Sequence, residues 1–104
     1  LPGKKIVFSN SPSAYLDRLL KLLEIKHFFD DTYSIESTKM YPKPARNGYL
    51  RLLKEHKLEA SSCVMVEDSL VNLVTARKLG MKTIWVTPRI GRCSWVDARI
   101  SKLY

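Results

Sequence analysis

The sequence predicts an α/β fold in which a parallel sheet is flanked by helices. Short apolar runs, such as Ile6 to Ser9 and Val64 to Val66, alternate along the chain with segments of helical periodicity. Apolar strands separated by helices are typical of parallel sheets that are covered on both faces. With 104 residues, of which 45% are hydrophobic and 27% charged, the chain has the composition of one small globular domain.

The first strand, Ile6 to Ser9, leads into a predicted amphipathic helix. Ser11-Pro12 supplies an N-cap and a first-turn proline. Leucines then recur with helical spacing, at Leu16, Leu19, Leu20 and Leu23. We expect this helix to end near Ile25, and the pair Phe28-Phe29 to pack beneath it.

A weaker strand and a second helix follow. The strand is predicted over Thr32 to Ser37, and a loop with two prolines comes after it. Pro44 can start the next helix. Its expected apolar face is Tyr49, Leu52 and Leu53, with Leu50 adjoining.

The second half of the chain repeats the order of strand and helix. Val64 to Val66 is expected to be buried on both faces, and Ser69 can cap a helix that bears Leu70, Leu73, Val74 and Ala76. Gly80 can adopt the left-handed turn that closes this helix. Lys82 to Thr87 is the last predicted strand, and a helix is expected from Val96 onward.

Composition excludes several classes of protein. The apolar stretches are far shorter than a membrane span requires. The net charge of +8 is spread along the chain, and its densest cluster, Arg89 to Arg92, is too short for a nucleic-acid arm. Cys63 and Cys93 form no CxxC motif, which favours a reducing, cytoplasmic setting. His27 and His56 show no zinc-type spacing.

Polar residues follow the predicted strands. Ser9-Asn10 ends the first strand, Glu67-Asp68 ends the third, and Lys43 precedes the second helix. Function collects at the carboxyl ends of strands in parallel sheets. A hydroxyl, an amide and an ammonium suit an anion, whereas adjacent carboxylates suit Mg²⁺. Taken alone, each group has a plainer interpretation, as a helix cap, an exposed loop lysine or an acidic pair favoured by the helix dipole.

Three segments, IVFSN, YPKPARNGY and VMVEDSLVNLVTARKLGMKTIWV, together resemble the haloacid dehalogenase-like (HAD) superfamily of phosphohydrolases. The sequence of these segments is closest to that of the pyrimidine 5′-nucleotidase-like branch, and the resemblance spans Lys4 to Thr87. It implies a three-layer, Rossmann-like parallel sheet. It also implies Mg²⁺-dependent hydrolysis of a phosphorylated small molecule, such as a nucleoside 5′-monophosphate, through an aspartyl-phosphate intermediate.

The resemblance also implies a role for each polar residue. Ser9 would bind the transferring phosphoryl group, with help from Asn10. Lys43 would stabilise the negative charge of that group and of the nucleophile. Asp68 would hold Mg²⁺ together with Glu67.

One family motif does not occur in the sequence. The family's nucleophile lies in an Asp-x-Asp motif at the end of a central strand, and these 104 residues contain no such motif. We therefore expect residues 1–104 to be the C-terminal portion of a HAD-like core domain, without that strand and without the cap domain, and to be inactive alone. The absent strand would lie between the Ile6 to Ser9 and Val64 to Val66 strands, whose edges would be exposed. The chain is expected to pair with the N-terminal part or to self-associate.

Two other classes of function remain as alternatives. A signalling receiver domain uses similar groups around a phosphoaspartate, but its carboxylates come first and its lysine last, the reverse of the order Ser9, Lys43, Asp68. A non-catalytic basic module that binds RNA would explain the net charge, but the sequence has no stripe of alternating aromatic and basic residues.

Overall fold

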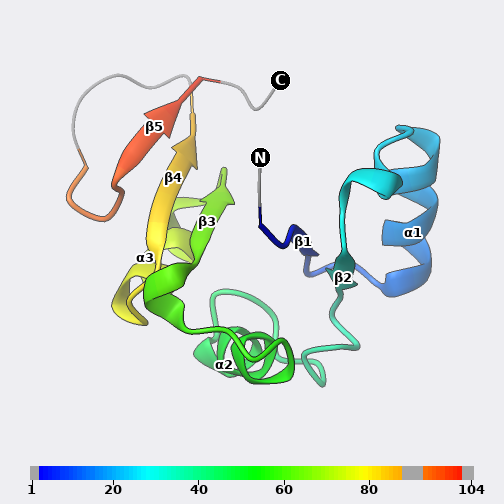
Figure 1. Ribbon diagram of the computed structural model, residues 1–104, viewed down its shortest axis with the longest axis horizontal. Coiled ribbons are helices and arrows are strands. Elements are labelled where there is room, and N and C mark those ends of the chain that lie inside the picture. Colours follow the sequence, from blue (N-terminus) through cyan, green and yellow to red (C-terminus); the bar gives the residue numbers. More distant parts are fainter. Residues whose placement is uncertain (1–2, 88–92, 102–104) are drawn as a thin grey trace. The chain divides into compact units, whose positions relative to one another are not determined.

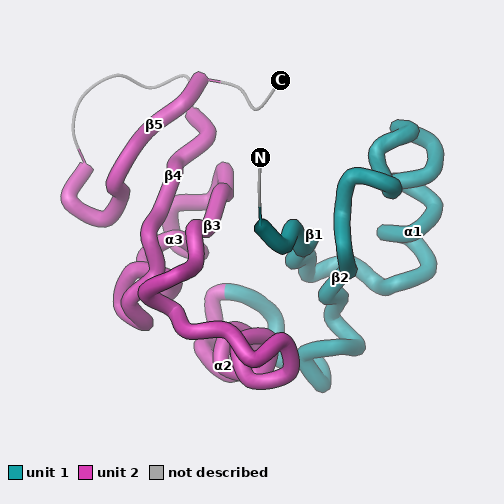
Figure 2. The backbone as a smooth tube through the Cα atoms, in the orientation of Figure 1, with its two compact units in different colours: residues 1–43 teal, residues 44–104 magenta. Residues whose placement is uncertain are grey.

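The computed structural model describes residues 3–87 and 93–101. The chain divides into two compact units, residues 1–43 and 44–104, which are coloured separately in Figure 2. Both units are built on parallel strands with helices between them (Figure 1). The predicted α/β class is therefore confirmed. No helix within the two described ranges has both the length and the apolar character needed to cross a membrane.

The first unit holds a two-stranded parallel sheet and one α-helix. Its elements are β1 (Ile6–Phe8), α1 (Ser13–Leu22), the 3-10 helix η1 (Lys26–Phe28) and β2 (Asp31–Tyr33). The strands pair with Val7 opposite Thr32. β2 is shorter than the predicted strand because the chain turns after Tyr33, where the Ser34 N–H donates to Ser37 Oγ at 3.0 Å.

The start of α1 is capped by a residue distant in sequence. Pro12 occupies the N-cap position, so the helix begins at Ser13, and Ser11 is not the cap. The Glu36 carboxylate accepts the Ser13 N–H at 3.0 Å and the Ser13 hydroxyl at 2.8 Å. These hydrogen bonds hold the pKa of Glu36 below its usual value. A carboxylate at a helix N-terminus is also favoured by the helix dipole.

The end of α1 falls earlier than the leucine pattern predicts. Glu24 adopts a left-handed conformation with φ of 58°, and the Ile25 N–H donates back to Leu20 O at 3.1 Å. This arrangement is a common way to end a helix, although glycine usually takes the left-handed position. Leu23 therefore does not complete the buried stripe and is exposed. Phe28, which was expected to pack beneath the helix, is also exposed.

The second unit holds a three-stranded parallel sheet of order β3-β4-β5. Its elements are α2 (Arg46–Glu55), the 3-10 helix η2 (Ala60–Ser62), β3 (Val64–Glu67), α3 (Leu70–Lys78), β4 (Lys82–Val86) and β5 (Ala98–Ile100). The prediction of a helix from Val96 is wrong, because this segment adds a strand to the edge of β4. The Thr87 N–H donates to Ile100 O at 2.8 Å. The cluster Arg89 to Arg92 lies outside the described residues.

The core of the second unit gathers around α3. Leu73 and Ala76 are completely buried, and Met65 on β3 and Trp85 on β4 are nearly so. The helix ends as predicted, with Gly80 in the left-handed region at φ of 98°. Tyr49, Leu52 and Leu53 of α2 are buried as predicted, whereas Leu50 is exposed.

β3 is not buried on both faces, contrary to prediction. Met65 is 7% exposed, but Val64 is 56% and Val66 is 42% exposed. Side chains alternate between the two faces of a strand, so one face of β3 is covered and the other is open. Within the described part of the chain, β3 pairs only with β4, and β1 pairs only with β2. Each of these strands therefore has one edge without a neighbouring strand.

Asp97 holds the β5 segment against β4. Its carboxylate accepts the Thr83 N–H at 2.7 Å and Arg77 Nη1 at 2.8 Å, and both bonds lower the pKa of Asp97 below its usual 3.8. A carboxyl group whose pKa is lowered by folding stabilises the folded state above its unfolded pKa, and this stabilisation is lost as the pH falls through the folded pKa.

We expect the stability of the chain to fall less steeply with acid in Asp97→Asn than in the unmodified chain. The measurement is the urea midpoint at about pH 6 and at about pH 3. Other carboxyl groups with lowered pKa, such as Glu36, titrate in both proteins, so the difference between the two slopes isolates Asp97. Equal slopes would contradict the role assigned to this carboxylate.

Candidate active site

Ser9 lies directly after β1, with its main chain and side chain both fixed. Its N–H donates to Tyr33 O at 2.9 Å, which extends the pairing of β1 with β2 by one step. Its Oγ accepts the Ser11 N–H at 3.1 Å. A hydroxyl that accepts one hydrogen bond still carries its own O–H, so Ser9 can donate to an anion.

Asn10 binds the main chain of Lys43 with both ends of its side-chain amide. Oδ1 accepts the Lys43 N–H at 2.7 Å, and Nδ2 donates to Lys43 O at 3.1 Å. The two residues are far apart in sequence, so these bonds tie the proline-containing loop to the end of β1. The sequence placed Asn10 and Lys43 near one anion but gave no sign that they contact each other.

The Lys43 ammonium lies at the carboxyl end of β1. Nζ donates to Phe8 O at 2.9 Å and lies 4.9 Å from the centroid of the Phe8 ring. The first unit therefore brings together three of the predicted site residues, Ser9, Asn10 and Lys43. An ammonium carries three N–H donors, so contact with the Phe8 carbonyl is compatible with contact to a phosphate oxygen.

Glu67 and Asp68 lie at the carboxyl end of β3, in the second unit. The Asp68 carbonyl accepts the indole N–H of Trp85 at 3.0 Å, which ties the turn after β3 to β4. Glu67 Oε1 accepts the Ser69 N–H at 3.4 Å. Ser69 occupies the N-cap of α3 as predicted, but its side chain makes no capping bond. The acidic side chain of Glu67 binds a main-chain N–H there instead.

Burial and the charge of Glu67 affect the pKa of Tyr49. Burial, and after it the negative charge of Glu67, raise the pKa of the Tyr49 hydroxyl, while a hydrogen bond involving Thr75 lowers it. The hydroxyl donates to Asn72 O at 2.7 Å, so α2 is bonded to α3 one turn after the acidic pair. Thr75 Oγ1 adds a second bond, to Pro44 O at 2.7 Å. The sequence did not identify this contribution of Tyr49 and Thr75, because their partners are main-chain carbonyls.

The acidic pair fits Mg²⁺ as part of a ligand set. Mg²⁺ commonly takes one or two carboxylates and completes its octahedron with waters and substrate phosphate. Asp68 is exposed, and Glu67, the half-buried last residue of β3, directly precedes it. Over residues 3–87 and 93–101, no group of three or more His, Cys, Asp or Glu side chains is positioned to hold a metal. Any further ligands would therefore be waters, the substrate or other protein groups.

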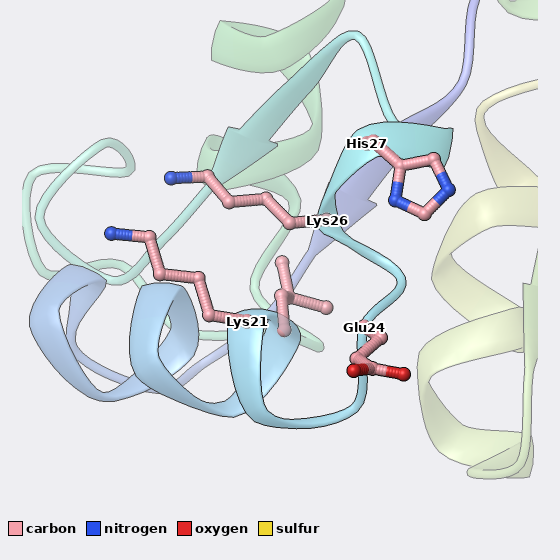
Figure 3. A pocket seen from close by; sticks show the side chains of 5 residues that line it. Lys21, Glu24, Lys26 and His27 are labelled. Atoms are coloured by element: carbon pink, nitrogen blue, oxygen red, sulfur yellow. The ribbon is translucent and has the colours of Figure 1, made fainter.

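A surface hollow of the first unit lies away from these residues. Its volume is about 450 Å³, and its lining residues are Leu20, Lys21, Glu24, Lys26 and His27. Figure 3 labels the four polar ones. Lys21 and Lys26 both form ion pairs with Asp17, which offsets part of their charge. All four polar residues at its rim are exposed, and none belongs to the predicted site. A smaller hollow of about 270 Å³ in the second unit is lined by Pro44, Arg46, Thr75, Lys78 and Leu79.

Solved structures share this fold. A HAD phosphatase from Thermococcus onnurineus superposes with a TM-score of 0.81 at 25% identity, over 95% of this chain and 46% of that one. The magnesium-bound HAD-hydrolase YfnB from Bacillus subtilis superposes with a TM-score of 0.84 at 20% identity, over 96% of this chain and 44% of that one. The fold is thus that of a Rossmann-like α/β core.

Sequence comparison identifies the family. The model of the haloacid dehalogenase-like hydrolase family matches residues 4–86. Fructose-1-phosphate phosphatase YqaB of Escherichia coli (strain K12) is 30% identical over 78 residues, which are 75% of this chain and 41% of that protein. The chain belongs to the haloacid dehalogenase-like hydrolases, and it spans less than half the length of these relatives.

Proposed function

We propose that this chain is the phosphate- and Mg²⁺-binding portion of a phosphomonoester hydrolase. The observation that carries the proposal is the meeting of Ser9, Asn10 and Lys43 at the end of β1, where a hydroxyl and an ammonium can contact one anion. Membership of a hydrolase family and similarity to a sugar phosphatase support this function. The receiver-domain and RNA-binding alternatives have no comparable support.

Each residue has a defined part in the proposed reaction. Ser9 donates its O–H to a phosphoryl oxygen, and the main-chain N–H of Asn10 assists it. Lys43 places its positive charge beside the phosphoryl group and the nucleophile, where charge shifts in the transition state. Asp68 and Glu67 hold Mg²⁺ as oxygen ligands. When bound, Mg²⁺ would screen the phosphate charge and orient the leaving group.

The nucleophile is proposed to come from outside these 104 residues. Hydrolysis through an aspartyl-phosphate needs a carboxylate at the site, and the sequence contains no Asp-x-Asp motif to supply it. We propose that a further segment of the protein adds a strand beside β1 and β3, and that self-association covers these edges when that segment is absent. Within the described residues, β1 and β3 each have one edge without a neighbouring strand, which is consistent with such pairing.

Two substrate classes are proposed for comparison. The loop YPKPARNGY and the VMVEDS segment favour a nucleoside 5′-monophosphate, by resemblance to the pyrimidine 5′-nucleotidase-like branch. The similarity to a fructose-1-phosphate phosphatase favours a sugar phosphate. Both are phosphomonoesters, so the groups that bind the phosphate would be the same for either substrate.

The experiment compares the chain alone with an assembly, meaning the chain joined to or mixed with the proposed segment that supplies the nucleophile. Phosphate release from p-nitrophenyl phosphate, UMP and fructose 1-phosphate is measured with Mg²⁺. We expect the chain alone to be inactive and the assembly to be active. The ratio of kcat/KM for UMP and fructose 1-phosphate then assigns the substrate class.

Three outcomes would overturn parts of this proposal. Turnover by the chain alone would refute the external nucleophile. Size-exclusion chromatography with light scattering tests the exposed edges, because a stable, soluble monomer of the chain alone would contradict the proposed pairing. An assembly that hydrolyses none of the three esters would contradict the phosphomonoesterase function itself.

A further inference from the structure

We propose that Asn10 is a positioning residue, whose side chain acts on the reaction by fixing Lys43. This inference rests on the proposed function, because it assigns to Asn10 a part in placing the ammonium that stabilises the phosphoryl group. The resemblance to the family had assigned Asn10 to phosphate binding. The structure directs its side chain to a different partner.

The geometry of the amide carries the inference. A side-chain amide has one oxygen and one nitrogen in a plane, and both are engaged by a single residue, at 2.7 Å to Lys43 N and 3.1 Å to Lys43 O. Two bonds to the same residue fix the rotation of the amide as well as its position. The pairing has the same donors and acceptors as one step of a β-ladder.

Lys43 contacts both residues that flank Ser9. Its main chain is bonded to Asn10, and its Nζ donates to Phe8 O at 2.9 Å. Ser9 is itself held by its N–H to Tyr33 O and by its Oγ to the Ser11 N–H. The Ser9 hydroxyl and the Lys43 ammonium are therefore both positioned by the same short segment of main chain at the end of β1.

Removal of the Asn10 side-chain amide would loosen the loop that carries Lys43, and it would not remove a contact to the substrate. Lys43 is flanked by Pro42 and Pro44, and neither proline has an N–H with which to hold the loop. Both bonds from Asn10 hold the main chain of Lys43 in the first unit. A loosened lysine spends less time where the transition-state charge develops, so kcat should fall while substrate affinity changes little.

The first test is hydrogen exchange on the chain alone. In Asn10→Ala the Lys43 amide should lose its protection, because its acceptor is removed. The Ser9 amide, which donates to Tyr33 O, should keep its protection and so reports that β1 and β2 remain paired. If the Lys43 amide exchanges equally in both proteins, Asn10 does not hold it and the inference is wrong.

The second test is a double-mutant cycle in the active assembly, with Asn10→Ala, Lys43→Met and both together. We expect Asn10→Ala to lower kcat about tenfold with little change in KM, as the loss of one or two hydrogen bonds implies. In the Lys43→Met background the same change should have no further effect, because a residue that acts through Lys43 has nothing left to position.

The outcomes separate this inference from the proposed function. If Lys43→Met leaves kcat unchanged, the role of Lys43 in the proposed function fails. If Lys43→Met is severe but the two effects multiply, or if Asn10→Ala raises KM alone, Asn10 binds substrate directly and only the positioning role fails. Ser13→Ala is the matched control. Ser13 lies three residues after Asn10, and the change removes its side-chain hydrogen bond to Glu36 without touching Lys43.

Discussion

Replacing Asp68 with Asn should lower kcat/KM of the active assembly at least about a hundredfold. The change keeps the size of the side chain but removes the charge that a hard divalent cation prefers. It should also raise the Mg²⁺ concentration needed for half-maximal activity. Steady-state kinetics over a Mg²⁺ titration measures both effects. The main-chain carbonyl of Asp68, which accepts the Trp85 indole N–H, is retained in the variant.

The control for Asp68→Asn is Glu55→Gln. Glu55 is a carboxylate of the same unit, on α2, and its ion pair with Arg51 is exposed to solvent. Exposed pairs of this kind contribute little, so activity and Mg²⁺ dependence should stay as in the unmodified protein. If Asp68→Asn retains full activity at limiting Mg²⁺, the metal role of Asp68 is wrong.

Leu73→Ala should be the most destabilising change in the second unit, costing about 2–5 kcal/mol in the free energy of unfolding. Leu73 is completely buried on α3, so its truncation leaves a cavity that neighbours fill only in part. Small domains are stable by about 5–15 kcal/mol, and a large share of that would be lost. Urea unfolding followed by circular dichroism gives the value.

Val71→Ala on the same helix is the matched control for Leu73→Ala. Val71 is 60% exposed, so removing its methyl groups should change the stability by no more than about 0.5 kcal/mol. Equal losses for the two variants would mean that α3 packs with a different face inward from the one described here.

Most of the fold could be predicted because its signals are local. The apolar runs at Ile6 and Val64, the buried face of α2 and the Gly80 turn all depend on residues within a few positions of one another. The errors arose where a residue distant in sequence determines the local structure. Glu36 caps α1 from 23 positions away, and Asp97 pulls the C-terminal segment onto β4 as a strand. The residues next to the start of α1 and next to the C-terminal segment give no indication of these distant partners.

The burial of β3 was mispredicted for a related reason. An apolar run has the same sequence pattern whether both faces of the strand are buried or only one is, because the elements that bury each face lie elsewhere in the protein. Val64 and Val66 are apolar yet exposed in the described chain. The pattern records what the strand is suited to pack against, and only the structure shows which partner is there.

The candidate site was predicted by residue type but not by contact. The order of Ser9, Lys43 and Asp68 relative to the strands suggested these groups as a site, and the first unit brings Ser9 and Lys43 to one strand end. The amide of Asn10 on the Lys43 main chain was missed, because a bond to a backbone atom places no demand on the partner's side chain. The roles in catalysis remain proposals.

The bond from Trp85 to Asp68 gives the chain a built-in optical reporter. The indole is nearly buried and donates its N–H to the carbonyl of the residue proposed to hold Mg²⁺, whereas Trp95 is 39% exposed. Indole fluorescence responds to the polarity and the electric field around the ring. Emission from Trp85, isolated in Trp95→Phe, would therefore follow events at the acidic turn in real time, without any attached dye.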